Sequence, residues 1–283
     1  MAVKSLTAAI VGAALLAAAA PAVAATHAVE PKDVDFSFEG PFGKFDRGAL
    51  QRGFKVYQEV CSACHSMNLV YYRNLAQKGG PFYDEKHPNP SDSPYAKAIA
   101  AEAMVADIDP DTGDANTRPA TPADHLRSPF ANEAAARAAN GGALPPDLSL
   151  ITKAREGGPA YVYSLLTGYV AAPAGLTVPP GQYFDPYIPG DLAANWSGPK
   201  DKVPHGGILA MPFQLPAGRV SFDDGTKSTT EQEAHDVVTF LAWAAEPHQE
   251  ERKQTGFAVL AYLLIFAGIM YASYRRIWRN VAH

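Results

Sequence analysis

The chain has 283 residues and a formal net charge of −5. Four of its 24 basic residues lie in two apolar terminal segments or directly beside them, so the part between holds 20 basic and 29 acidic residues, a net charge of −9. This acidic surface argues against nucleic-acid binding and for a basic soluble partner. Cys61 and Cys64 are the only cysteines, which excludes an additional structural disulfide and a four-thiolate metal site.

Residues 1 to 25 predict a secretory signal peptide. Lys4 precedes an apolar run from Ala8 to Ala20, and Pro21-Ala22-Val23-Ala24-Ala25 supplies an A-x-A cleavage site. The run is too short to span a bilayer comfortably, which disfavours a permanent anchor. We therefore expect residues 26 to 253 to form one exported domain.

The first helix of this domain is predicted over residues 47 to 60. Asp46 is a suitable N-cap, and Leu50, Phe54 and Tyr57 fall on one face. The helix would lead directly into the cysteine pair.

Cys61-Ser62-Ala63-Cys64-His65 is typical of a c-type haem attachment site. Each thiol adds to one porphyrin vinyl group, and the adjacent imidazole becomes the proximal iron ligand. Because haem is attached to exported apocytochromes, the signal peptide supports this interpretation. A zinc site would need further ligands from scattered histidines, and a redox dithiol would need a βαβ context. We therefore expect one covalently attached haem c.

Residues 79 to 129 are rich in Gly and Pro and predict long irregular loops around one Ala-rich helix near residues 94 to 106. The stretch from Asp107 to Gly113 has an aspartate at every second position, which resembles a calcium loop. It lacks the Gly and bidentate Glu positions of an EF-hand, so we interpret it as a solvated acidic loop.

The last helix of the domain is predicted over residues 230 to 245. Ser228-Thr229-Thr230-Glu231 offers a capping box, and Pro247 marks the end. Apolar residues repeat at helical spacing at Val237, Phe240, Leu241 and Ala244. The first and last helices would close over a porphyrin.

A haem that only carries electrons needs a second axial ligand, and methionine suits this role. Met67 is too close to His65 in sequence to reach the opposite face. Met211 is favoured over Met104, because Pro212 pushes it toward an extended conformation, whereas Met104 falls in the predicted Ala-rich helix. The histidines that remain as alternatives are His87, His125 and His205.

Residues 254 to 274 contain no charged side chain and are long enough to cross a hydrocarbon core of roughly 30 Å. Tyrosines and Trp278 cluster toward the ends of this segment. Arg275, Arg276 and Arg279 follow, so the positive-inside rule places residues 275 to 283 in the cytoplasm. We expect a single-pass anchor in the inner membrane, with the haem domain on the periplasmic side.

Six separate segments together resemble the cytochrome c1 family of cytochrome bc1 complexes, in its short alphaproteobacterial form. They cover residues 61–75, 142–149, 163–169, 183–187, 210–213 and 236–247. The resemblance implies a mainly α, class I cytochrome c-like haem domain with long irregular insertions, plus one C-terminal transmembrane helix.

The resemblance also implies roles for individual residues. Cys61 and Cys64 would carry the thioethers, and His65 and Met211 would ligate iron. Further residues would line the haem pocket: Arg155 beside a propionate, Tyr161 near the ring, and Asn140, Pro145 and Pro146. Some bacterial relatives brace the methionine loop with a disulfide, which this chain cannot form, so we expect packing alone to hold the loop.

The implied function is one-electron transfer, from the Rieske iron-sulfur protein to a basic soluble or tethered cytochrome c, within a dimeric complex that includes cytochrome b. The chain itself would perform no bond chemistry on quinol. Two alternatives remain open. One is an anchored cytochrome that delivers electrons to a terminal oxidase, and the other is a haem enzyme or gas sensor with an open sixth position.

Overall fold

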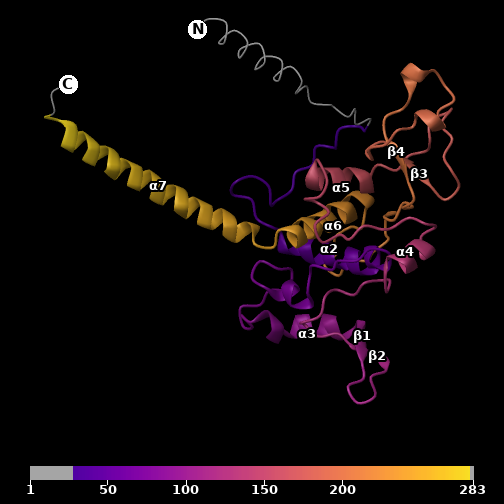
Figure 1. Cartoon of the computed structure of the whole chain (residues 1–283), viewed down its shortest axis with the longest axis horizontal. Coiled ribbons are helices and arrows are strands. Elements are labelled where there is room, and N and C mark those ends of the chain that lie inside the picture. Colours follow the sequence, from indigo (N-terminus) through magenta and orange to yellow (C-terminus); the bar gives the residue numbers. More distant parts are fainter. Residues whose placement is uncertain (1–27, 281–283) are drawn as a thin grey trace, which may run out of the picture.

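The computed structural model describes residues 28 to 280, so the predicted signal peptide lies outside the described residues. The chain is mainly helical, as expected (Figure 1). The α-helices are α2 (Arg47–Glu59), α3 (Pro94–Ala101), α4 (Glu133–Ala139), α5 (Gly158–Leu166), α6 (Thr230–Ala245) and α7 (Gln249–Trp278). The short 3₁₀ turns are η1 (Cys61–Ala63), η2 (Tyr72–Ala76), η3 (Pro90–Asp92), η4 (Ala193–Asn195) and η5 (Lys200–Lys202).

The crossing of α2 and α6 forms the centre of the domain. Both helices match their predicted spans to within one residue. The two backbones meet at Gly53, where a Cβ atom would lie 2.0 Å from the carbonyl oxygen of Asp236. Phe54 of α2 packs edge-to-face on Phe240 of α6, with ring centroids 5.5 Å apart. The glycine is required because any side chain would force these helices apart.

Polar groups fix both helices at their ends and along the crossing. The Asp46 carboxylate accepts from the Ala49 N–H at 2.8 Å, so the predicted N-cap of α2 is confirmed. The N-cap of α6 is Thr229, whose hydroxyl accepts from the Gln232 N–H. The fully buried carboxylate of Asp236 pairs with the Arg52 guanidinium at 2.7 Å. That ion pair joins α2 to α6.

The segment from 79 to 129 differs from its prediction. Helix α3 ends at Ala101, and an antiparallel hairpin follows, formed by β1 (Met104–Ile108) and β2 (Ala115–Pro119). A helix extending to residue 106 was therefore wrong, because the residues from Met104 onward pair with β2 as an antiparallel strand. The acidic stretch forms the hairpin turn, where the Asp109 carboxylate accepts from the backbone N–H groups of Asp111 and Thr112.

A second hairpin pairs β3 (Tyr183–Asp185) with β4 (Gly207–Leu209). Its small apolar cluster contains Leu176, Phe184 and Leu192 and is separate from the main core. This hairpin leads directly to Met211.

Helix α7 leaves the domain just after α6 and projects away from it (Figure 1). It is 30 residues long, and its most apolar 18-residue window has a mean hydropathy of 2.0 with none of it buried. By length and composition it could cross a membrane. Its first turns are tied to the domain, because Glu250 pairs with Arg47 at 3.1 Å and the Lys253 ammonium donates to the carbonyls of Phe38 and Gly43.

Candidate haem site

The end of α2 presents the two thiols. The chain tightens into η1, where the N–H groups of Cys64 and His65 both donate to the Cys61 carbonyl, at 3.1 and 2.9 Å. Both cysteines are free, Cys61 half-buried and Cys64 exposed. Burial, and then the neighbouring Cys64, raise the pKa of the Cys61 thiol to about 12, so that this thiol is uncharged. One short turn therefore holds both groups needed for covalent attachment.

The His65 ring is oriented by the backbone. Its Nδ1 donates to the carbonyl oxygen of Pro146 at 2.7 Å. Burial lowers the pKa of His65 despite the opposing hydrogen bond to Pro146 and the charge of Asp147, which favours the neutral imidazole. A neutral imidazole whose Nδ1 donates to a carbonyl presents Nε2 for a metal, the usual arrangement of a ligating histidine.

A network around Asp147 holds this carbonyl in place. Its Oδ2 accepts from the Ser66 hydroxyl and the Asn68 N–H, and its Oδ1 accepts from the Ser149 N–H, each at 2.8 Å. The fully buried Ser149 hydroxyl accepts in turn from the Leu69 N–H at 3.0 Å. These four hydrogen bonds join the segment that follows Pro146 to the segment that follows His65, apart from the Ser149 N–H bond, which lies within the first of them.

The charge state of Asp147 follows from these bonds. Burial alone would raise its pKa, but hydrogen bonds from Ser149, Asn68 and Ser66 outweigh burial and lower the pKa. The carboxylate is therefore ionised at neutral pH. The sequence reasoning assigned no role to Asp147, although an Asp two residues before a Ser is a common turn signal that could have pointed to it.

The methionine loop is held by more than packing. The Tyr169 hydroxyl donates to the Met211 carbonyl at 2.9 Å, and the Tyr169 ring contacts Phe213 with centroids 5.6 Å apart. Upstream, Gly206 has a φ of +119°, and a Cβ there would lie 2.6 Å from the Asp185 carbonyl oxygen. The expectation of packing alone was therefore incomplete, because the β3–β4 pairing and the tyrosine bond also restrain the loop.

The remaining predicted pocket residues lie on nearby loops and helices. Asn140 caps α4, its side chain donating to the Ala136 carbonyl at 2.7 Å. Arg155 is exposed and close enough to half-buried Tyr161 to affect its pKa, although burial dominates and raises that pKa. Pro145 is half-buried beside Pro146. Their contacts with a porphyrin stay predictions.

The alternative axial ligands occupy other settings. Met104 begins β1 with an exposed side chain rather than lying in a helix. The His87 ring bonds to Asp84 at 2.8 Å, and the His125 ring stacks on Tyr71 with centroids 4.0 Å apart. His205 lies exposed shortly before β4. Within residues 28 to 280, no three His, Cys, Asp or Glu residues gather as a metal-binding group.

These residues fit a c-type haem in their chemistry. Two thiols three positions apart, a neutral imidazole oriented through Nδ1 and a thioether from a restrained loop are the groups that such a haem needs. Sequence reasoning named every one of them. It assigned no role to Asp147, which bonds to the segment after His65, or to Tyr169, which bonds to the Met211 carbonyl.

Comparison with known proteins agrees with this chemistry. The model of the Cytochrome C1 family matches residues 36–281. The chain is 44% identical to cytochrome b/c1 of Bradyrhizobium diazoefficiens over 89% of its length, but spans only 36% of that protein. It is 43% identical to cytochrome c1 of Rhodospirillum rubrum, covering 88% of each chain. It is 44% identical to a mitochondrial cytochrome c1 heme protein of Arabidopsis thaliana, covering 89% of this chain and 73% of that one.

The family match covers most of the chain, and the resemblance seen in the six segments is confirmed. The relatives include two alphaproteobacterial proteins, from Bradyrhizobium and Rhodospirillum. The chain therefore belongs to the cytochrome c1 family, electron carriers with a covalently bound haem c.

Proposed function

We propose that the chain is the haem-bearing subunit of a cytochrome bc1 complex, with His65 and Met211 as axial ligands. The observation that carries this proposal is the hydrogen bond from His65 Nδ1 to the Pro146 carbonyl, directly beside two free thiols. It is the arrangement expected of a proximal ligand. The bound haem would supply a single-electron iron couple.

The protein's own task is to hold both ligands still, so that little rearrangement accompanies each electron. The Asp147 network fixes the loop that orients His65, and Tyr169 restrains the loop that carries Met211. Arg155, Tyr161, Asn140, Pro145 and Pro146 would line the pocket. A thioether ligand favours the reduced iron and keeps the potential high.

The partners follow from the family and the charge. Electrons would arrive from the Rieske iron-sulfur protein and leave to a basic cytochrome c, beside cytochrome b in a dimeric complex. The acidic domain would attract the basic acceptor electrostatically, so transfer would slow as ionic strength rises. After removal of a signal peptide over residues 1–25, residues 26–253 would face the periplasm, residues 254–274 would cross the membrane and residues 275–283 would face the cytoplasm.

A matched pair of variants tests the ligand assignment. Met211→Leu removes the thioether while keeping the side-chain volume, and Met104→Leu is the control. We expect carbon monoxide to bind reduced Met211→Leu but neither the wild type nor Met104→Leu, and the midpoint potential to fall only in Met211→Leu. Carbon monoxide binding by the wild type would contradict the closed sixth position.

Purification of the membrane complex tests the wider role. We expect cytochrome b and a Rieske protein to co-purify with the chain in stable proportion. Co-purification with a terminal oxidase instead would overturn the proposed function, while leaving the ligand assignment intact.

A further inference from the structure

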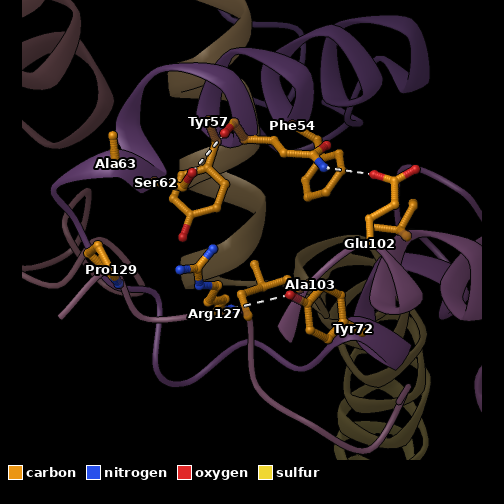
Figure 2. A pocket seen from close by; sticks show the side chains of 12 residues that line it. Phe54, Tyr57, Ser62, Ala63, Tyr72, Glu102, Ala103, Arg127 and Pro129 are labelled. Carbon is orange, nitrogen blue, oxygen red and sulfur yellow. Dashed lines mark hydrogen bonds between the residues drawn. The ribbon is translucent and has the colours of Figure 1, made fainter. Parts of the chain in front are cut away.

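A cavity of about 340 Å³ lies beside the attachment turn (Figure 2). Its wall includes Ser62 and Ala63, between the two cysteines, but neither cysteine, His65 nor any predicted haem-lining residue. The other walls come from α2, α3 and the loop that follows β2. The volume is within the range of small-molecule sites.

Most of the lining residues, though not most of the lining area, are apolar or aromatic. Phe54 and Tyr57 contribute from α2, Ile99 from α3, Tyr72 from η2, and Leu126 from the loop after β2. Such a surface suits the flat body of an aromatic ligand.

The buried hydroxyl of Tyr57 faces this space and has no partner. Tyr57 is 2% exposed, and its hydroxyl oxygen is buried without a hydrogen bond to any residue from 28 to 280. In Figure 2 the Tyr57 ring extends into the cavity toward Arg127. Leaving a buried hydroxyl unsatisfied costs roughly 1–3 kcal/mol, so an acceptor supplied by a ligand would recover that cost.

Arg127 brings a positive charge to the same end of the cavity. Its backbone N–H donates to the Tyr72 hydroxyl at 3.3 Å, which holds the residue at the wall. Within the described part of the chain its guanidinium makes no ion pair and no hydrogen bond. A guanidinium recognises a carboxylate through two parallel hydrogen bonds.

The opposite end of the cavity is negative. Glu102 lines it, with its carboxylate accepting from the Gln58 amide at 3.3 Å. One cationic end and one anionic end favour a ligand with a single negative charge over a dianion such as phosphate.

We propose that this cavity binds a small aromatic monocarboxylate, whose carboxylate pairs with the Arg127 guanidinium and accepts a hydrogen bond from the Tyr57 hydroxyl. The aromatic ring would lie against Phe54 and Leu126. The site is independent of haem ligation and of the partners proposed above.

Calorimetric titration of the purified full-length holoprotein in detergent tests this proposal. The probe is benzoate, and benzamide is the uncharged control of the same shape, with each titrated into detergent alone as the blank. We expect saturable binding of benzoate and at least tenfold weaker binding of benzamide. Equal affinity for the two probes, or no saturable benzoate binding at millimolar concentration, would overturn the proposal.

Single variants assign the contacts. Arg127→Gln should weaken benzoate binding at least tenfold, whereas Arg219→Gln, at an exposed arginine outside the cavity, should leave it unchanged. Glu102→Gln should tighten binding by removing a repulsive charge. Wild-type affinity in Arg127→Gln would exclude the site even if benzoate binds elsewhere.

Tyr57→Phe separates ligand binding from folding. Removing an unsatisfied buried hydroxyl should leave the thermal midpoint equal or higher, while benzoate binding weakens severalfold. Unchanged benzoate affinity in a folded Tyr57→Phe protein would show that the hydroxyl serves no ligand.

Discussion

Replacing Asp147 by Ala tests whether the carboxylate holds the loop that orients His65. The change removes three hydrogen bonds of 2.8 Å and leaves the N–H groups of Asn68 and Ser149 without acceptors. The part-buried Ser149 N–H would be left unsatisfied at a cost of roughly 1–3 kcal/mol, whereas water can reach the exposed Asn68 N–H, so we expect a loss of about 2 kcal/mol in the free energy of unfolding. Urea unfolding of the full-length holoprotein, followed by haem absorbance, measures this loss.

A second aspartate provides the matched control. The Asp109 carboxylate also accepts from two backbone N–H groups, at 2.9 and 3.1 Å, but in an exposed hairpin turn where water can replace it. We expect Asp109→Ala to cost less than about 1 kcal/mol. Equal losses in both variants would refute the special role of the Asp147 network.

The same prediction has a pH dependence. Because the folded-state pKa of Asp147 is lowered, its contribution is complete above its unfolded pKa of about 3.9 and disappears as the pH falls toward the folded value. The stability difference between wild type and Asp147→Ala should therefore shrink on acidification below about pH 4. A difference that stays constant down to pH 2 would contradict the assignment of the lost energy to the ionised carboxylate.

Three further predictions concern other parts of the domain. Gly53→Ala should lower the free energy of unfolding, measured by thermal denaturation, by about 3 kcal/mol, because its Cβ would clash with the α6 backbone. Gly48→Ala in the same helix is the control: its Cβ would meet only side-chain tips at 3.2 Å, so stability should change by less than about 1 kcal/mol. Tyr169→Phe should weaken retention of the Met211 ligand by about 1 kcal/mol, seen as increased carbon monoxide binding by the reduced protein; a wild-type result would show that the hydrogen bond is dispensable. Burial raises the pKa of Asp185 to about 6, so ionisation of this group makes folding progressively less favourable as the pH rises from about 4 to 6. The free energy of unfolding of Asp185→Asn should therefore rise by about 3 kcal/mol relative to that of the wild type over this interval. Parallel pH profiles of stability for the two proteins would refute this prediction.

The two long domain helices could be predicted because their signals are local. Asp46 and Thr229 cap them, and apolar residues recur at helical spacing along each. The β1–β2 hairpin could not, since its strands are short and exposed and follow an alanine-rich helix without an evident stop. Backbone pairing across the turn decides the structure there.

The proposed ligand set could be named from the sequence alone, because cysteine, histidine and methionine carry their chemistry in their side chains. The group that orients His65 was not visible, because it is the backbone carbonyl of Pro146, and every residue has one. The Asp147 network depends on two segments about 80 residues apart meeting in the fold. Such contacts belong to tertiary structure and have no local pattern.

Only three residues separate the end of α6 from the start of α7, and the first turns of α7 are bonded to the domain through Glu250 and Lys253. A short connection fastened in this way leaves no flexible tether between the anchor and the globular part. With α7 in a bilayer, the domain would keep a fixed orientation relative to the membrane and could not move between an electron donor and an electron acceptor. The partner proteins would therefore have to move to the haem domain to exchange an electron and then dissociate from it.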